Sequence, residues 1–294
     1  MPTDPYELDP DRSPPGTRQL LQRVRRRWDD LRIPSLDEHE LEERDPEHLR
    51  LVTLNVAHGR KRGPHQILQP RARLEQNLRD VAAALLHASP DVVALQEADG
   101  PSSWSGRFDH VATIAEMARL EHHFRGDHGL FRLGDLELQY GTALLSRQEL
   151  GDPESHAFDK NWRDTKGFVV ARVAVPQWGD LDVDVVSVHL DFLAPNVRRR
   201  QIGHMAEVIR SRSRPTILLG DLNSDARATQ AMLEQELGLR HCPVSRTPTY
   251  PAIRPLRRLD WVLVSDEIDF ACQHVVLPHR VSDHLAVVAD LKLR

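Results

Sequence analysis

With 294 residues, 40% of them apolar, the chain is long enough to bury a large core as one or two domains. It contains no apolar run long enough to span a bilayer, no signal-peptide pattern at its start and no cysteine cluster typical of structural zinc sites, so we expect a cytoplasmic protein. The formal net charge of −5 lies entirely in the first 47 residues, which hold 13 acidic and 8 basic side chains and leave 31 of each sign elsewhere. Any attraction for an anionic substrate must therefore come from local clusters of charge.

Residues 1–47 are predicted to form an extension outside the catalytic domain. Up to about Pro15 the segment is rich in Pro, Asp and Arg and has few side chains that can pack, which predicts disorder. Residues 18–33 favour a short helix that docks through one apolar face. The arginines at 25–27 are expected on the solvated side of that helix rather than on nucleic acid or membrane.

From Leu49 onward, apolar runs of strand length alternate with amphipathic helical stretches, which predicts one α/β domain over residues 48–294. The predicted strands cover residues 49–56, 91–97, 140–146, 168–175, 181–190, 216–223, 259–264 and 285–293. Many of them are apolar on both faces, so we expect helices to cover the sheets. The clearest helices are predicted over residues 71–88 and 196–211, where apolar side chains recur at helical spacing.

Several of these apolar strands end in one polar residue that can bind metal or phosphate, namely Asn55, Glu97, His189, Asp221 and Asn223. Three further candidates, Asp260, Asp283 and His284, stand where strands begin. Antiparallel pairing would bring those beginnings to the edge where the other strands end. The set is rich in oxygen ligands, which suits Mg²⁺ or Mn²⁺ better than zinc, and Glu97 is the natural anchor.

Taken in chain order, these motifs resemble the endonuclease/exonuclease/phosphatase superfamily from about residue 49 to residue 294. The matching pieces are TLNV with Asn55, ALQE with Glu97, YGTALLS, VSVHLD with His189, GDLN with Asp221 and Asn223, RLDWVL with Asp260, and SDH at 282–284. The resemblance implies a DNase I-like α/β fold, a four-layered sandwich of two packed, mainly antiparallel β-sheets flanked by helices. It also implies a Mg²⁺-dependent phosphoesterase, with Mn²⁺ as a possible substitute.

The resemblance further implies a role for each matched residue. Glu97, assisted by Asn55, would hold the metal on a nonbridging phosphate oxygen, and Asp283 would contact this metal or a second one. Asp221 would orient or deprotonate the attacking water. His189 and Asn223 would donate to the phosphate, and Asp260 would hold His284 as it stabilises the transition state.

Two departures bear on the substrate. Ala57 stands where exonuclease III-like nucleases usually carry an Asp, and SVHLD replaces their Tyr-Val-Pro-Asn type segment. Both departures argue against repair of abasic sites. The SVHLD segment, which contains His189, is more similar to the corresponding segment of DNase I, sphingomyelinases and the phosphatases.

The substrate class stays open between a phosphodiester, in nucleic acid or a phospholipid headgroup, and a phosphomonoester of a small molecule or inositol lipid. An inactive binding module is a remote alternative, because every expected ionisable position is filled. No obligate protein partner is evident. Substrate-binding side chains are expected in two basic clusters, Arg60, Lys61 and Arg62 after Asn55, and Arg257 and Arg258 before Asp260.

Three features near these motifs are open to simpler interpretations. His58 has no neighbours at ligand spacing, which favours an ordinary loop histidine. Asp191 either assists His189 or caps the following turn. Residues 104–110 form either a wall for the substrate or a packed loop.

Overall fold

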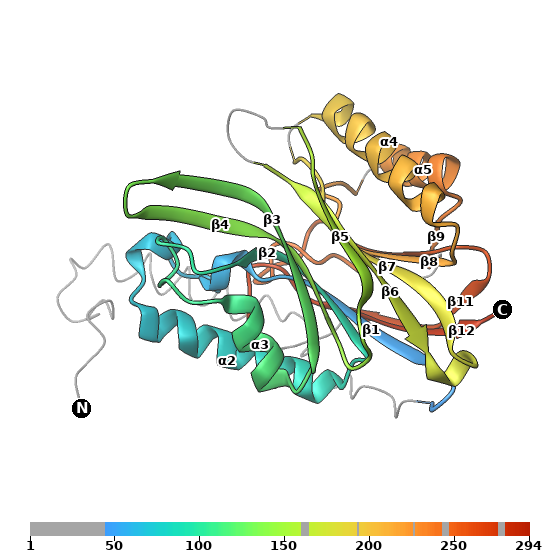
Figure 1. Ribbon diagram of the computed structural model, residues 1–294, viewed down its shortest axis with the longest axis horizontal. Coiled ribbons are helices and arrows are strands. Elements are labelled where there is room, and N and C mark those ends of the chain that lie inside the picture. The colour runs from blue at the N-terminus through green and yellow to red at the C-terminus, as the bar shows by residue number, and fades with distance from the viewer. Residues whose placement is uncertain (1–44, 160–164, 193, 226, 243–246, 276–279) are drawn as a thin grey trace, which may run out of the picture. The chain divides into compact units, whose positions relative to one another are not determined.

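Figure 1 shows the computed structural model of the chain, which describes residues 45–159, 165–192, 194–225, 227–242, 247–275 and 280–294. The chain divides into two compact units, Met1–His39 and Glu40–Arg294, and only the second contains described residues. The predicted disorder before Pro15 and the helix predicted at 18–33 lie outside them. No helix in the described part of the chain is long and apolar enough to cross a membrane.

One sheet contains strands from the start and the end of the described chain. Within the described residues it has six strands in the order β11-β12-β1-β2-β4-β3. Their bounds are β1 (Leu49–Asn55), β2 (Val92–Asp99), β3 (His122–Leu133), β4 (Leu136–Ser146), β11 (Ile268–Val275) and β12 (Val287–Leu293). Strands β1 and β2 pair in parallel, and the other neighbours pair antiparallel.

A second sheet carries the middle of the sequence, with the described strands in the order β5-β6-β7-β8-β10-β9. Their bounds are β5 (Gly151–Ala157), β6 (Gly167–Val175), β7 (Leu181–His189), β8 (Thr216–Asp221), β9 (Arg240–His241) and β10 (Asp260–Val264). Strands β7 and β8 pair in parallel, and the other neighbours pair antiparallel. Both sheets are thus mainly antiparallel, as predicted.

Helices cover the outer face of each sheet (Figure 1). Leu74 and Leu78 of α2 (Arg71–Ala88) and Ile114 of α3 (His110–Ala118) pack with Leu54 and Leu95 of the first sheet. On the second sheet, α4 (Pro195–Arg212) and α5 (Arg227–Leu237) take the same position. A separate core fills the space between the sheets, and the four-layered sandwich predicted from the resemblance is confirmed.

The predicted strands all form, but four of the strands in the described residues fall outside the predicted set. These are β3, β5, β9 and β11, and each is an edge of its sheet. The edge strand β5, for example, reads GDPESHA and has no fully buried side chain. Edge strands are half-exposed and carry polar residues and Pro, so they lack the apolar signal of central strands.

Candidate active site

The pairing of the strands brings the predicted polar residues to one edge of the sandwich. Asp221 ends β8 and lies in register with Asp260, the first residue of the antiparallel β10. It also lies in register with His189 at the end of the parallel β7. Asn55 ends β1 in the other sheet, and its side chain reaches across to donate to Asp221 at 3.1 Å. Polar side chains from both sheets therefore meet at this edge.

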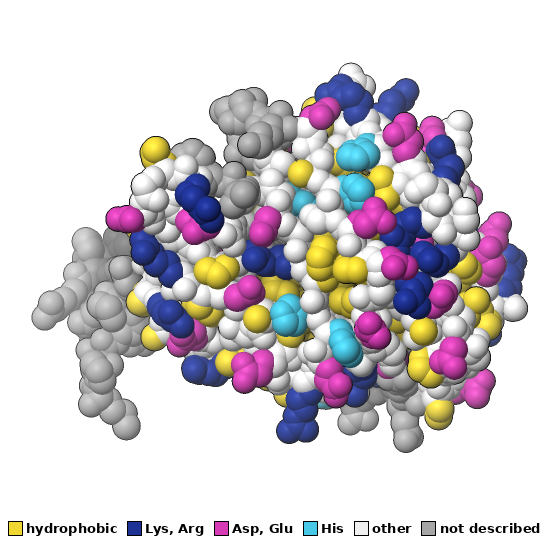
Figure 2. Space-filling view, in the orientation of Figure 1, with side chains coloured by type: hydrophobic (Ala, Val, Ile, Leu, Met, Phe, Trp, Pro, Cys, Tyr) yellow, Lys and Arg dark blue, Asp and Glu magenta, His cyan; other side chains and the backbone are white. Residues whose placement is uncertain are grey.

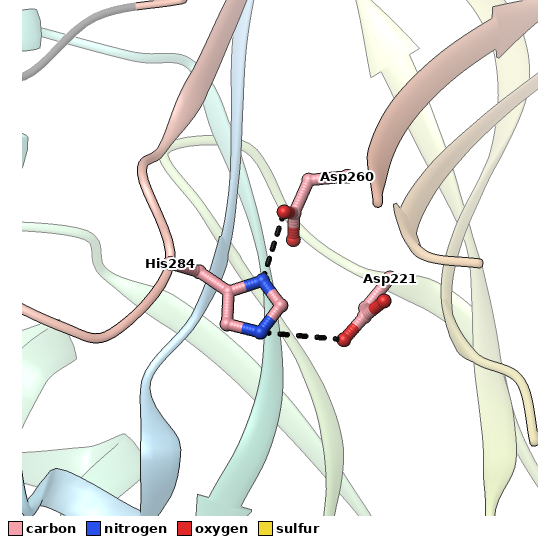
Figure 3. Close-up of side chains that lie close together, drawn as sticks. All are labelled: Asp221, Asp260 and His284. Atoms are coloured by element: carbon pink, nitrogen blue, oxygen red, sulfur yellow. Dashed lines mark hydrogen bonds and ion pairs between the residues drawn. The ribbon is translucent and has the colours of Figure 1, made fainter. Parts of the chain in front are cut away.

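Asp221 lies at the centre of this group. Its Oδ2 accepts from Asn55 and lies 3.5 Å from His189 Nε2 and 3.8 Å from His284 Nε2. The imidazole of His284 lies between two carboxylates, because its Nδ1 donates to Asp260 Oδ2 at 2.9 Å (Figure 3). Carboxylate, imidazole and carboxylate thus form a continuous chain of polar contacts.

Burial and charge set the protonation of this chain. Burial lowers the pKa of His284, but the carboxylates of Asp260 and Asp221 outweigh it and raise the pKa to about 10. Burial raises the pKa of Asp221 to about 6, although the nearby His284 imidazole partly opposes the shift. His284 is therefore a cation at neutral pH that can stabilise developing negative charge, and Asp221 is basic enough to accept a proton from water.

His189 and Asn223 lie on the other side of Asp221. Asn223 adopts a left-handed backbone conformation with φ 50°, and its backbone N–H donates to Asp221 Oδ1 at 2.8 Å. Its amide nitrogen lies 3.0 Å from His189 Nε2. Burial, followed by the ammonium of Lys166, lowers the pKa of His189 well below its usual value. A neutral His189 and the Asn223 amide are thus placed together beside the carboxylate of Asp221.

Glu97 reaches the site through an irregularity in its strand. The side chain of Gln96 points toward the second sheet, where it donates to Ser187 of β7 at 3.1 Å. Side chains alternate along a regular strand, so Glu97 would then point to the opposite face of its sheet, away from β7. The pairing of β2 with β4 instead shifts between Leu95 and Ala98, and Glu97 has φ 50°. This β-bulge re-aims the carboxylate toward Lys166, whose Nζ lies 3.9 Å from Oε1.

The electrostatic surroundings keep Glu97 anionic. Burial raises the pKa of its carboxyl, but the cationic groups of His58 and Lys166 outweigh burial and hold the pKa far below its usual range. The nearest cations, His58 Nε2 at 3.5 Å and Lys166 Nζ at 3.9 Å, lie beyond an ordinary N–H···O distance. A partly exposed carboxylate that attracts two cations, and is not bonded directly to either, fits a hard divalent cation such as Mg²⁺.

A pocket opens beside Glu97. Its lining includes Glu97, His189, Tyr140, Thr142 and Lys166. Hydroxyl, ammonium and imidazole groups around one carboxylate are the donors and acceptors that a bound phosphate group requires. The pocket therefore joins the carboxylate of Glu97 to side chains that can contact phosphate oxygens.

Comparison with known proteins bears directly on this geometry. The model of the endonuclease/exonuclease/phosphatase family matches residues 52–284. The chain belongs to this family. Members of the family are phosphoester hydrolases and generally depend on divalent metal, so the chain is a phosphoesterase. No curated protein matches its sequence.

Solved structures of the endonuclease/exonuclease/phosphatase family show the same fold. A family member from Beutenbergia cavernae is 25% identical, with 84% of this chain and 72% of that chain covered and a TM-score of 0.67. A mannosyl-6-phosphatase from Bacteroides thetaiotaomicron is 16% identical, with 83% and 99% covered and a TM-score of 0.62. TDP2 from D. rerio, in complex with a single-strand DNA product, is 16% identical, with 83% and 99% covered and a TM-score of 0.59.

In this family member the sequence patterns did not single out Lys166 or the contact made by His58. Lys166 precedes Gly167, the first residue of β6, and so stands at the beginning of a strand, as Asp260 does. The same placement rule would have found it. His58 was expected to be an ordinary loop histidine, but the structure places its Nε2 3.5 Å from Glu97 Oε2.

The first predicted substrate-binding cluster is largely engaged in ion pairs. Arg60 Nη2 lies 2.5 Å from Asp283 Oδ2, and Lys61 Nζ lies 2.8 Å from Asp80. Arg62 is exposed. The pairing of Asp283 with Arg60 holds that carboxylate next to the site, and its contact with a metal stays a prediction.

The second cluster splits between surface and interior. Arg257 is half-exposed and lies 3.5 Å from Asp225, whereas Arg258 is buried with its guanidinium 4.5 Å from the centre of the Trp261 ring. On the face shown in Figure 2, Lys and Arg side chains lie interspersed with Asp and Glu. Substrate contacts of both clusters stay predictions.

Asp191 and residues 104–110 have structural contacts. Asp191 Oδ1 accepts from the backbone N–H of Ala194 at 3.0 Å, which matches the turn-capping interpretation. Trp104 Nε1 donates to Asp99 Oδ2 at 2.8 Å, and its ring lies 5.3 Å from that of Tyr140. This part of the loop is packed next to the pocket.

Proposed function

We propose that this chain hydrolyses a phosphodiester bond, in nucleic acid or in a phospholipid headgroup, with Mg²⁺ as its metal and Mn²⁺ as a substitute. The observation that supports the proposal is the convergence of Asn55, His189 and His284 on one oxygen of Asp221. This arrangement places a proton acceptor between a cationic imidazole and the side chains beside Glu97. In-line attack of water on phosphorus requires such a set.

Each residue then has a defined task. Asp221 takes a proton from the attacking water, and the new P–O bond forms as the ester P–O bond opposite it breaks. His284, held by Asp260, stabilises the charge that develops on the phosphate oxygens. Asn223 and His189 orient the phosphate from the other side.

The metal would be held by Glu97 and Asn55, with Asp283 as a further predicted contact. When bound, Mg²⁺ supplies a Lewis acid that withdraws charge from a nonbridging phosphate oxygen. Lys166 lies close enough to Glu97 and His189 to contact the same phosphate. All of these groups lie on chain segments that the two sheets bring to one edge.

A phosphomonoesterase acting on a small molecule or an inositol lipid is the second candidate. The observation that favours it is Lys166 in the pocket beside Glu97, because a terminal phosphate carries more negative charge than a diester. The fold is shared with a mannosyl-6-phosphatase and with TDP2 bound to single-strand DNA, which fits either class. Substrate chemistry must separate them.

We expect metal-dependent cleavage of a bis-aryl phosphodiester that exceeds cleavage of the matching aryl phosphomonoester. Initial rates are measured on the full chain after removal of metal, and again after addition of Mg²⁺ or Mn²⁺. Full activity in excess chelator would contradict the metal assignment, and a higher kcat/KM for the monoester would favour the second candidate. A screen of product formation from oligonucleotides, choline phospholipids and inositol phosphates then identifies the substrate class.

We also expect Lys166→Ala to lower kcat/KM for that diester by about tenfold to a hundredfold, because a charge-assisted hydrogen bond contributes about 1.5–3 kcal/mol. Lys292→Ala is the matched control, since Lys292 is exposed near the end of β12. A folded Lys166→Ala protein with wild-type kcat/KM would remove this residue from the site.

A further inference from the structure

A second histidine–carboxylate pair lies beside Glu97 and has no task in the mechanism above. His58 Nδ1 lies 2.6 Å from Asp99 Oδ1 and must be the donor, because a carboxylate only accepts. Asp99 is fully buried, and its other oxygen accepts from Trp104 Nε1 at 2.8 Å. With Nδ1 engaged, the opposite ring nitrogen, Nε2, faces Glu97 Oε2 at 3.5 Å.

Aromatic contacts hold the imidazole in this orientation. The rings of Trp104 and Tyr140 approach His58 edge-on, with centroids at 5.2 Å and 5.5 Å. Rotation of the imidazole about its side-chain bonds would break the bond to Asp99 and change both ring contacts. The direction of Nε2 is therefore set before any ligand binds.

The backbone beneath His58 is also constrained. Ala57 and His58 have φ 47° and 53°, in the left-handed region that few non-glycine residues adopt, and Glu97 has φ 50°. The turn is held by Asn77 of α2, whose side chain donates to Gly59 O at 2.9 Å. Such conformations persist where the surroundings fix them, and they cluster at functional sites. Here they aim His58 and Glu97 at one another.

A neighbouring histidine shows what simple packing would look like. His65 also approaches the ring of Trp104, at 5.7 Å, but it is exposed and its Nδ1 accepts from the backbone of Ile67 at 3.4 Å. It has no ion pair with Glu97 among the described residues. A histidine can therefore pack on Trp104 without facing Glu97, so packing on this ring does not by itself explain the orientation of His58.

We propose that Asp99 and His58 form a positioning pair for the metal-binding carboxylate of Glu97. The ion pair from His58 Nε2 to Glu97 Oε2, at 3.5 Å, attracts and restricts the carboxylate without a direct hydrogen bond, so that less freedom is lost when a divalent cation binds. Partners of this kind, one step removed from the metal, typically change metal affinity by about tenfold to a hundredfold when they are mutated. The inference rests on the proposed function, because it takes Glu97 as the metal anchor.

The test is Mn²⁺ binding to the full chain without substrate, followed by the loss of the free Mn²⁺ signal in electron paramagnetic resonance. We expect His58→Ala to raise the Mn²⁺ dissociation constant by about tenfold to a hundredfold. His58→Gln keeps an N–H donor and a similar volume, so its dissociation constant should be intermediate. His65→Ala is the matched control and should bind Mn²⁺ as the wild type does. Thermal unfolding midpoints show whether each variant is folded.

Three results would overturn the proposal. The first is a wild-type dissociation constant in folded His58→Ala, or in folded His58→Gln if the alanine variant does not fold. The second is a directly coordinated ¹⁴N in the spin-echo spectrum of bound Mn²⁺ that disappears in His58→Ala, since it would make His58 a ligand. The third is a wild-type protein that binds no Mn²⁺, which would also count against the proposed function. If the wild type binds Mn²⁺ and cleaves the diester, and the His58 variants have the wild-type dissociation constant, this inference is wrong but the proposed function still stands.

Discussion

Replacing Asp221 by Asn is expected to lower kcat by at least about a hundredfold, the usual effect of losing a general base. The substitution keeps the shape of the side chain but removes the proton acceptor. It also replaces one accepting oxygen with an NH2 donor, although the two oxygens of Asp221 accept from Asn55 and from the backbone of Asn223. The measurement is the initial rate on the bis-aryl phosphodiester at saturating Mg²⁺.

Asp266→Asn is the control for this prediction, because Asp266 is highly exposed and its ion pair within the described residues is with Arg240, at 3.6 Å. Unfolding midpoints of both variants are compared, since a buried Asn with mismatched partners can also lower stability. Turnover near the wild-type rate in folded Asp221→Asn would exclude this residue as the base.

Replacing Glu97 by Gln is expected to abolish most metal binding, with a loss in kcat/KM of about a thousandfold. The physical reason is that a bound divalent ion contributes several kcal/mol to charge stabilisation in the transition state. A neutral amide also leaves Lys166 and His58 without their shared anion. The measurements are the Mn²⁺ dissociation constant and the Mg²⁺ dependence of the rate, which should shift to higher concentration.

Glu116→Gln is the control, because Glu116 lies on an exposed position of α3. If folded Glu97→Gln binds Mn²⁺ with wild-type affinity, the metal is anchored elsewhere. The group formed by Asp221, Asp260 and His284, whose ligand atoms lie within 4.8 Å of one another, would then be the next candidate.

Much of the fold was predictable because central strands and core helices carry a local signal. The helix predicted at 71–88 forms over those residues, since its apolar stripe packs on the first sheet. The central strands follow the apolar runs, because both faces of each are covered. The edge strands β3, β5, β9 and β11 were not predictable in this way, since each pairs on one side alone among the described strands and their sequences are more polar.

The sequence by itself determined which residues form the core of the candidate site, because a polar side chain at the end or the beginning of an apolar strand stands out within a short window. Asp221 and Asp260 face one another as antiparallel pairing requires. The direction of Glu97 was decided only by the tertiary structure, through a bulge that depends on the partner strand β4. The same holds for the contact between His58 and Glu97 and for the pairing of Arg60 with Asp283, which is 223 residues away in the chain. Contacts of this kind depend on how distant segments meet in space, and no local pattern of residues encodes them.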